Sequence, residues 1–371
     1  MISNTLSYII SIFKGNLKTD LSINEWERII FILRECDTLP MAYESSKISG
    51  TLNNYPEYAI KHMHAAQIYS KRQAQQVRYE CTEIAKTLEE TGIQPVFLKG
   101  AGYTLRNSRN SLGRIYTDID VLVPKHQLNA AEKALNRHSW STKRLNNYDE
   151  RYYRQWSHEI PPMFQIHRGT VLDLHHNIVP PMGRKAKDIS SLLSQTVLTT
   201  GGFKVLSPEA TVLHSSAHLF TNEDFSHGFR DLIDLYVLIS DFESDTFWEK
   251  LLLLAYKTEL TLELYYALTC CKFYWELNIP DDINTDLRTK HKNILTAFNI
   301  CIFKLGLQPH HPLIQEKKHS LACLLIFIRG HWKKMPKHLL LFHIISKAWT
   351  MFINQIFGKH HFDPPKPDLH R

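Results

Sequence analysis

The chain has 371 residues, of which 43% are hydrophobic and 22% charged, and its formal net charge is +7. This composition is typical of a globular protein with a substantial core and excludes wholesale disorder. The six cysteines form no Cys-x-x-Cys pair, which excludes a disulfide framework or a zinc-finger spacing. No apolar run reaches the 18 residues of a membrane-spanning helix. Reduced, mostly buried thiols and a cytoplasmic location are therefore expected.

Residues 1–90 are predicted to form an N-terminal helical region. An apolar stripe recurs there at spacings of three and four, which is typical of an amphipathic helix. It consists of Ile23, Trp26, Ile30 and Leu33. Ser22 and Glu25 form a capping-box pattern at the start of this helix. Residues 58–88, rich in Gln, Ala and Lys, predict one long helix.

Residues 91–205 change to an α+β pattern and are predicted to form the core region of the chain. Short apolar runs rich in β-branched residues predict strands, and Ala-rich periodic segments predict helices. The predicted elements are a strand at 96–98, a helix at 103–109, a strand at 119–123, a helix at 128–137 and a β-hairpin of 164–167 with 171–175.

Residues 206–302 return to a helical pattern. Ser207 suits an N-cap and Pro208 the first helical position, and Leu232, Leu235 and Ile239 belong to an apolar stripe. Residues 303–371 form a basic helical segment with a loose tail. This segment holds 11 Lys and Arg against 3 Asp and Glu, whereas residues 1–302 hold 33 against 34.

Asp118 and Asp120 are two residues apart at the start of the predicted strand 119–123. Residues i and i+2 of a strand project from the same face, so both carboxylates should point together. Two such carboxylates repel each other unless a cation lies between them, and Mg²⁺ prefers oxygen ligands of this kind. Asp173 lies in another predicted strand and can complete a three-carboxylate metal site. It is also the best candidate to deprotonate an attacking hydroxyl.

Lys99, Gly100 and Ala101 lie between a predicted strand and a predicted helix. A glycine at this position lets backbone N–H groups approach a phosphate, and a helix N-terminus favours negative charge. Lys99 and Arg114 could neutralise a triphosphate. The alternative is that Gly100 ends the strand and both cations are surface residues.

Three histidines have two interpretations each. His214 and His218 share one face of a predicted helix, but no third ligand is evident, so helix packing or hydrogen bonding is favoured over zinc. His175 shares a face with Asp173, where it either lines the pocket or makes a structural hydrogen bond.

The ordered combination of these motifs resembles the uncharacterised nucleotidyltransferase family of bacteria, a branch of the DNA polymerase β-like superfamily. The similarity covers roughly residues 20–240. It rests on residues 96–101, on Arg114 with Asp118-Ile119-Asp120-Val121-Leu122-Val123, on Leu172-Asp173-Leu174-His175, and on the segment from Ser207 to His218 with Arg230, Asp231 and Asp234. It implies an α+β fold in which a small mixed-sheet nucleotidyltransferase core is flanked by helical regions.

The resemblance also implies the reaction. The expected enzyme transfers a nucleoside monophosphate from a nucleoside triphosphate, such as ATP, to a hydroxyl acceptor. Asp118, Asp120 and Asp173 would bind Mg²⁺, with Mn²⁺ as the alternative ion, and Lys99, Gly100, Ala101 and Arg114 would bind the nucleotide. The acceptor is open: a protein, a tRNA or a small molecule. The alternatives are a toxin-like, tRNA-directed transferase and a non-catalytic accessory protein. Residues 303–371 could contact RNA, a membrane surface or neither.

Overall fold

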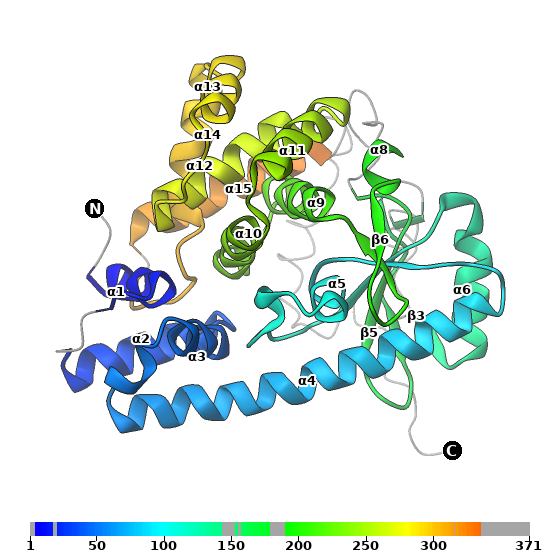
Figure 1. Ribbon diagram of the computed structural model, residues 1–371, viewed down its shortest axis with the longest axis horizontal. Coiled ribbons are helices and arrows are strands. Elements are labelled where there is room, and N and C mark those ends of the chain that lie inside the picture. Colours follow the sequence, from blue (N-terminus) through cyan, green and yellow to red (C-terminus); the bar gives the residue numbers. More distant parts are fainter. Residues whose placement is uncertain are drawn as a thin grey trace, which may run out of the picture.

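The computed structural model describes residues 4–17, 21–142, 153–154, 157–178, 190–314 and 316–334 (Figure 1). The fold is α+β, as predicted: a mixed sheet lies on one side of the molecule and a group of helices on the other. Within these ranges, no helix is both long and apolar enough to cross a membrane.

The sheet has seven strands in the order β3-β4-β5-β2-β1-β7-β6. Their bounds are β1 (Val96–Phe97), β2 (Ile119–Leu122), β3 (Trp140–Thr142), β4 (Met163–Gln165), β5 (Val171–His175), β6 (Thr196–Leu198) and β7 (Lys204–Leu206). β2 pairs in parallel with β5, and β1 with β7, whereas the other neighbours are antiparallel. The centre of the sheet is therefore built from segments far apart in the sequence.

Helices flank the sheet and extend beyond it. Their bounds are α1 (Asn4–Lys14), α2 (Ile23–Glu35), α3 (Leu39–Ile48), α4 (Glu57–Glu89), α5 (Lys99–Arg106), α6 (Leu128–Arg137), α8 (Ser190–Leu193), α9 (Pro208–Thr221), α10 (Gly228–Phe242), α11 (Asp245–Lys257), α12 (Thr261–Trp275), α13 (Asp281–Lys290), α14 (Ile294–Gly306) and α15 (Lys317–Lys334). Three short 3₁₀ turns are η1 (Leu52–Asn54), η2 (Arg109–Ser111) and η3 (Lys125–Gln127).

The predicted helix starts are confirmed at α2 and α9. Ser22 and Glu25 form the reciprocal capping box, and the Ser207 side chain accepts a hydrogen bond from the Ala210 amide, with Pro208 at the first helical position. The prediction that Ile23 belongs to the buried apolar stripe of α2 is wrong. Ile23 is 70% exposed, because it lies in the first turn, before the helix meets its neighbours.

The helix predicted at residues 103–109 is displaced: α5 begins at Lys99 and ends at Arg106, where Asn107 adopts a left-handed conformation. The glycines that favoured a turn lie inside the helix. A Cβ at Gly102 would come within 2.8 Å of the Phe97 carbonyl oxygen, so the close approach of α5 to β1 requires glycine there. The predicted hairpin is confirmed, but its first strand ends at Gln165 and Ile166 belongs to the exposed turn.

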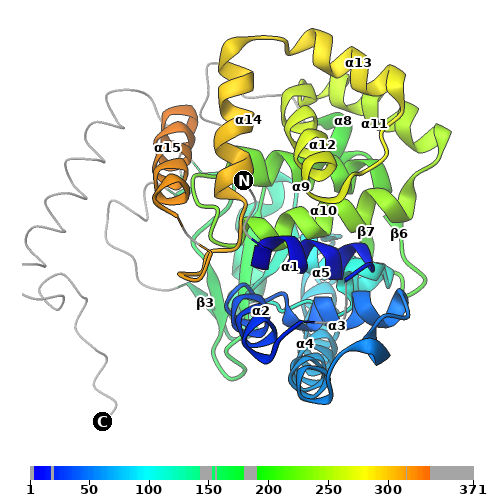
Figure 2. The same cartoon turned by 90° about the vertical axis from the view of Figure 1, so that its left-hand side faces the viewer.

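The buried side chains form two clusters. One cluster joins α1–α3 and the start of α4 to the helices from α9 to α15. The other lies between the sheet, α5, α6 and the second half of α4. The 33-residue helix α4 runs beneath both (Figures 1 and 2), and it thereby connects the sheet to the helical side.

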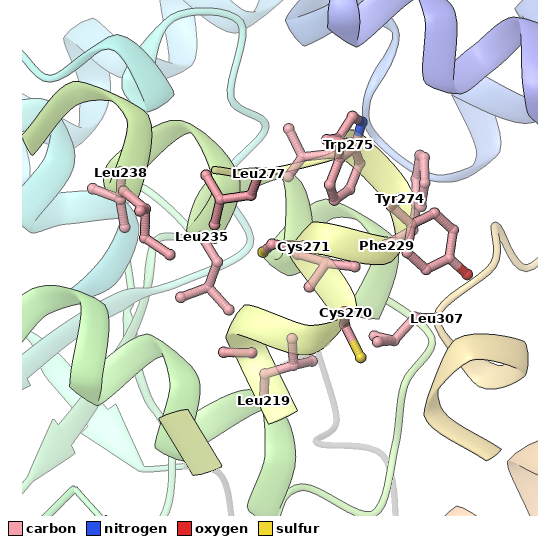
Figure 3. Close-up of a cluster of buried hydrophobic side chains, with 14 of the residues drawn as sticks. Leu219, Phe229, Leu235, Leu238, Cys270, Cys271, Tyr274, Trp275, Leu277 and Leu307 are labelled. Carbon is pink, nitrogen blue, oxygen red and sulfur yellow. The ribbon is translucent and has the colours of Figure 1, made fainter. Parts of the chain in front are cut away.

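Part of the first cluster is drawn in Figure 3, where aromatic and aliphatic side chains of α9, α10 and α12 meet. The ring centres of Phe229 on α10 and Trp275 on α12 lie 6.1 Å apart, and Cys270 and Cys271 on α12 are completely buried in the same cluster. All six cysteines lie in the described ranges, all are free, and four are buried. The expected reduced, mostly buried thiols are therefore present.

Candidate functional site

The candidate site is built on the two central strands β2 and β5. Their parallel register places Asp120 directly beside Asp173. Alternation along each strand sends the neighbouring apolar side chains to the other face, where they join the core under the sheet. Those side chains are Ile119, Val121, Leu172 and Leu174. Asp118 directly precedes β2, and all three carboxylates line one cavity.

Asp120 is the anchor of the site. Its side chain is almost completely buried, and its Oδ1 atom accepts hydrogen bonds from Lys99 Nζ at 2.7 Å and His175 Nε2 at 2.9 Å. Burial opposes the ionisation of Asp120, but the charges of Lys99 and His175 outweigh it and hold its pKa well below the usual value. His175 is not among the residues that line the cavity, so the observed one of its two predicted roles is the hydrogen bond.

Asp118 and Asp173 have no such partners among the described residues. Burial, followed by repulsion from Asp120, raises the pKa of Asp118. Burial and the nearby carboxylates of Glu159, Asp120 and Asp118 raise the pKa of Asp173 to about 8. The buried Oδ1 atom of Asp173 has no hydrogen-bond partner among the described residues. Burial and the repulsion between carboxylates therefore both oppose the ionisation of Asp118 and Asp173.

Lys99 occupies the first position of α5 with a φ angle of 42°. This left-handed conformation is unfavourable for a lysine, and strain of this kind gathers at functional sites. Here it accompanies the ion pair of Lys99 with Asp120. Gly100 lines the cavity, and a Cβ there would come within 2.8 Å of Arg114 Nε. Ala101 differs from both, because its side chain is buried in the core under the sheet rather than in the cavity.

Arg114 lies in the cavity wall and is only 6% exposed. Its Nη1 atom donates to the Asp234 carboxylate, and its guanidinium lies 5.4 Å from the ring centre of Tyr103. It is therefore an internal residue and not a surface cation. Burial, and next the charge of Arg230, lower the pKa of Arg114, so two guanidinium groups lie close together beside the carboxylates.

The cavity has a volume of about 320 Å³. It lies between the sheet edge of the site, the start of α5, and the segment from the end of α9 to the start of α10. Arg230 on α10 is 7% exposed, and its Nη1 atom has no hydrogen-bond partner in the part of the chain that the structure describes. Its remaining contacts are with Asp231 Oδ1 at 3.4 Å. Arg230 is thus a buried cation in the wall of a polar cavity, and its Nη1 donor has no acceptor among the described residues.

The sequence profile of a family described as an uncharacterised nucleotidyltransferase matches residues 22–276. The chain belongs to this nucleotidyltransferase family. Neither a curated protein nor a solved structure matches the chain. The matched range contains the whole cavity wall from Lys99 to Asp231, so the family assignment and the geometry point to the same part of this nucleotidyltransferase.

The carboxylates of the site are of the chemical kind that binds a divalent cation, although the three aspartates are not one of the groups of described residues whose ligand atoms all lie within 4.8 Å of one another. Asp118 and Asp173 have raised pKa values, and one buried oxygen of Asp173 is without a partner. A cluster of carboxylates in this state is the donor set that hard cations such as Mg²⁺ prefer. In this nucleotidyltransferase, Asp118, Asp120 and Asp173 are the residues that could hold the ion.

Glu159 and Arg230 were not among the site residues predicted from the sequence. Glu159 reaches the site because it bridges to His175, and its Oε2 atom lies 3.3 Å from His175 Nδ1. No spacing rule connects residue 159 to Asp120. Arg230 could have been found, since it belongs to the Arg-Asp pair on which part of the family resemblance rested. The sequence did not indicate, however, that its side chain enters the cavity.

His214 and His218 lie on one face of α9, with ring centres 6.5 Å apart. Burial lowers the pKa of His214 to about 3 and that of His218 well below its usual value. Both rings are therefore neutral at physiological pH. The groups of three or more potential metal ligands among the described residues include neither histidine; His218 lines the cavity, whereas His214 does not.

Asp173→Asn is expected to stabilise the metal-free protein. The pKa of about 8 in the folded state lies above the usual 3.8, so between these values the folded state binds more protons than the unfolded state. The free energy of unfolding therefore falls as the pH rises through this window. The amide removes this loss and should raise the free energy of unfolding at pH 8 by about 1–3 kcal/mol, the usual cost of a buried polar group without a partner.

Urea unfolding in EDTA at pH 8 and pH 4 measures this effect. The difference between Asp173→Asn and the unmodified protein should shrink toward pH 4, where Asp173 is protonated in the folded state and the pH approaches the usual pKa of 3.8 that applies to the unfolded state. Asp282→Asn, at an exposed position of α13, is the matched control. A lower stability of Asp173→Asn at pH 8 would contradict the charge repulsion.

Proposed function

We propose that the protein is a nucleotidyltransferase that transfers a nucleoside monophosphate from an NTP·Mg²⁺ complex to a hydroxyl acceptor. The acceptor oxygen forms a bond to the α-phosphorus, the bond between this phosphorus and the bridging oxygen to the β-phosphate breaks, and pyrophosphate leaves. The observation that carries the proposal is the meeting of Asp118, Asp120 and Asp173 in one cavity with buried cations beside them.

In this proposal, Asp118, Asp120 and Asp173 hold Mg²⁺, or Mn²⁺ in its place. The bound ion would neutralise phosphate charge and orient the triphosphate for in-line displacement. Lys99 and His175 fix the position of Asp120 through its Oδ1 atom. Asp118 has no comparable hydrogen-bond partner among the described residues, and its pKa is raised. Its carboxylate is therefore the one most available to bind the ion.

Asp173 is proposed to accept the proton of the attacking hydroxyl. A general base is most effective when its pKa lies near the working pH, and the pKa of Asp173 is raised to about 8. Its Oδ1 atom, which is buried and has no partner among the described residues, is the atom that would take the proton.

Arg230 is proposed to bind the triphosphate through Nη1, and Arg114 and Gly100 to line the same region. The two guanidinium groups lie close enough together that the charge of Arg230 lowers the pKa of Arg114. A phosphate between or beside them would relieve this repulsion. Lys99 already pairs with Asp120, so its main role in this proposal is to balance the charge of that carboxylate, and phosphate binding comes second. Ala101 would contribute its backbone N–H at the start of α5 and not its side chain.

Arg230→Gln is expected to weaken nucleotide binding by about 10- to 100-fold, because one charge-assisted hydrogen bond of about 1.5–3 kcal/mol is lost. The measurement is the dissociation constant of each NTP in the presence of Mg²⁺. Arg230→Lys should recover part of the affinity, and Arg288→Gln, on the exposed side of α13, should behave like the unmodified protein. Equal affinity in Arg230→Gln would remove this residue from the nucleotide site.

The acceptor is tested by incubating the protein with each radiolabelled NTP and Mg²⁺, and by offering cell protein, tRNA and a small-molecule extract separately. Label in one fraction, together with release of pyrophosphate, identifies the class of acceptor. Binding of NTP without release of pyrophosphate in any fraction would instead favour a non-catalytic accessory protein. Label in tRNA alone would favour the toxin-like alternative.

The basic C-terminal segment offers less to RNA than its composition indicates. Arg329 on α15 donates to the Phe220 carbonyl oxygen and lies over the Phe303 ring at 4.7 Å, and Lys333 lies 3.6 Å from Glu263. These two cations are used within the fold, while Lys317 and Lys318 are exposed. The predicted contacts of residues 335–371 with RNA or a membrane surface lie outside the described residues.

Two further parts of the proposal concern relationship and location. The family would be a branch of the DNA polymerase β-like superfamily, which is supported by an Asp pair at the start of one strand and a third Asp on the neighbouring strand. The protein would work in the cytoplasm, where six free cysteines stay reduced.

A further inference from the structure

A second group of possible ligands lies where α14 meets α15, apart from the cavity. It consists of His310 in the turn after α14 and of His319 and Cys323 on α15. None of the three lines the cavity. His319 and Cys323 are four residues apart, so their side chains lie on the same face of the helix. The sequence alone shows no zinc-finger spacing here, because the two ligands of the helix are four apart and the third lies in a preceding turn.

The distances within this group suit a tetrahedral metal ion. Cys323 Sγ lies 3.7 Å from His310 Nε2 and 3.7 Å from His319 Nδ1, and one ligand atom from each residue lies within 4.8 Å of the others. In a tetrahedral zinc site, bonds of about 2.3 Å to sulfur and about 2.0–2.1 Å to nitrogen place these atoms about 3.5–3.6 Å apart. The two sulfur–nitrogen distances are therefore within a few tenths of an ångström of those in a tetrahedral site, while the two ring nitrogens, which lie within 4.8 Å of each other, would have to approach to about 3.4 Å.

The contacts are poorly explained as hydrogen bonds alone. Both ring nitrogens of His319 lie at nearly the same distance from Cys323 Sγ, 3.7 and 3.9 Å, so the ring is not directed at the sulfur through one N–H group. His310 Nε2 also lies 3.3 Å from the Gly306 carbonyl oxygen, which is long for a hydrogen bond. His319 is buried, whereas His310 and Cys323 are half-buried, so an ion has a path to the group.

We propose that His310, His319 and Cys323 bind one Zn²⁺ ion, with water as the fourth ligand. Imidazole and thiolate ligands favour zinc over the hard cations that suit the three aspartates. The Cys323 thiol loses its proton to solvent when the ion binds. No fourth His, Cys, Asp or Glu belongs to this group among the described residues.

The position of the site indicates a structural role. The ion would fasten α15 to the turn that follows α14. On the same helix, Arg329 donates to the Phe220 carbonyl oxygen, and Gly330 lies so close to Glu223 that a Cβ would come within 2.5 Å of its Cα atom. Glu223 belongs to the segment that lines the cavity. Zinc would thus hold the helix that supports one wall of the candidate active site.

Cobalt is the probe for this site, because Co²⁺ bound by a thiolate gives an intense charge-transfer band in the near ultraviolet, while Co²⁺ on carboxylates does not. Titration of the full chain with Co²⁺ should give this band at one equivalent, and Zn²⁺ should abolish it. Cys323→Ser should remove the band, and His319→Asn should weaken Co²⁺ binding by at least ~10-fold, the lower limit seen even for outer-shell changes. Cys301→Ser, an exposed cysteine on α14, should leave both unchanged.

A second measurement needs no variant. Alkylation of the unmodified chain, followed by peptide mass spectrometry, should show that Zn²⁺ slows the labelling of Cys323 at least ~10-fold and leaves the labelling of Cys301 unchanged. Equal labelling of Cys323 with and without Zn²⁺ would overturn the proposal, as would a charge-transfer band that persists in Cys323→Ser. Neither result depends on nucleotidyl transfer, so this site and the proposed function can fail separately.

Discussion

Asp118→Asn is expected to reduce nucleotidyl transfer by at least ~1,000-fold, because a lost metal ligand removes several kcal/mol of charge stabilisation from the transition state. The fold should be unaffected. Asp118 is half-buried, repels Asp120 and accepts none of the hydrogen bonds that anchor the site. The measurement is the release of pyrophosphate with Mg²⁺ and the NTP and acceptor identified by labelling.

The informative comparison is with Asp282→Asn, an exposed carboxylate of α13, which should retain full activity. Metal-dependent binding of NTP should also be lost in Asp118→Asn, while the midpoint of thermal unfolding in EDTA stays the same or rises. Full activity in a folded Asp118→Asn protein would exclude the proposed assignment of the metal ligands.

Asp120→Asn is expected to have a large effect of a different kind: a fall of about 3–5 kcal/mol in the free energy of unfolding. Its carboxylate is the partner of both Lys99 and His175, and an amide would leave a buried ammonium group without its counter-charge. Urea unfolding of the metal-free protein measures this. The double substitution Asp120→Asn with Lys99→Met should recover much of the loss, since it removes both members of the pair.

If the free energy of unfolding of Asp120→Asn is no lower than that of Asp118→Asn, the Lys99–Asp120 pair contributes little to stability. The expected contrast matters for experimental design. Because Asp120 supports the fold as well as the site, loss of activity in Asp120→Asn could arise from unfolding, and only Asp118→Asn and Asp173→Asn report on the chemistry alone.

The carboxylates were predictable from the sequence because their geometry follows from local rules. Short runs rich in β-branched residues identified both strands. Alternation along each strand then places Asp120 and Asp173 on one face of the sheet and their neighbours Ile119 and Leu172 on the other. The helical regions were predictable for a similar reason, since apolar periodicity and capping residues act over a few positions.

The cations of the site were harder to predict, because their environment depends on contacts between distant segments. Lys99 and Arg114 were expected either at a phosphate or on the surface. Both line the cavity, and each is paired there with a carboxylate, Asp120 or Asp234; their contact with a phosphate stays a prediction. Arg230 enters the cavity only because the start of α10 forms part of the cavity wall. The start of α5 was misplaced because glycine usually signals a turn, whereas Gly102 serves the close packing of that helix on β1.

The joining of the first helix to late segments of the chain has a consequence for biosynthesis. The Phe13 ring on α1 meets Phe229 on α10, and Lys14 pairs with Glu276 at the end of α12. On a ribosome adding about 5–20 residues per second, α1 would wait roughly 10–50 s before these partners emerge. During that interval α2 and α3, which also pack on α1, can cover part of its apolar face, but the side that meets α10 and α12 stays exposed on the nascent chain, where chaperones that protect unfinished proteins could bind it.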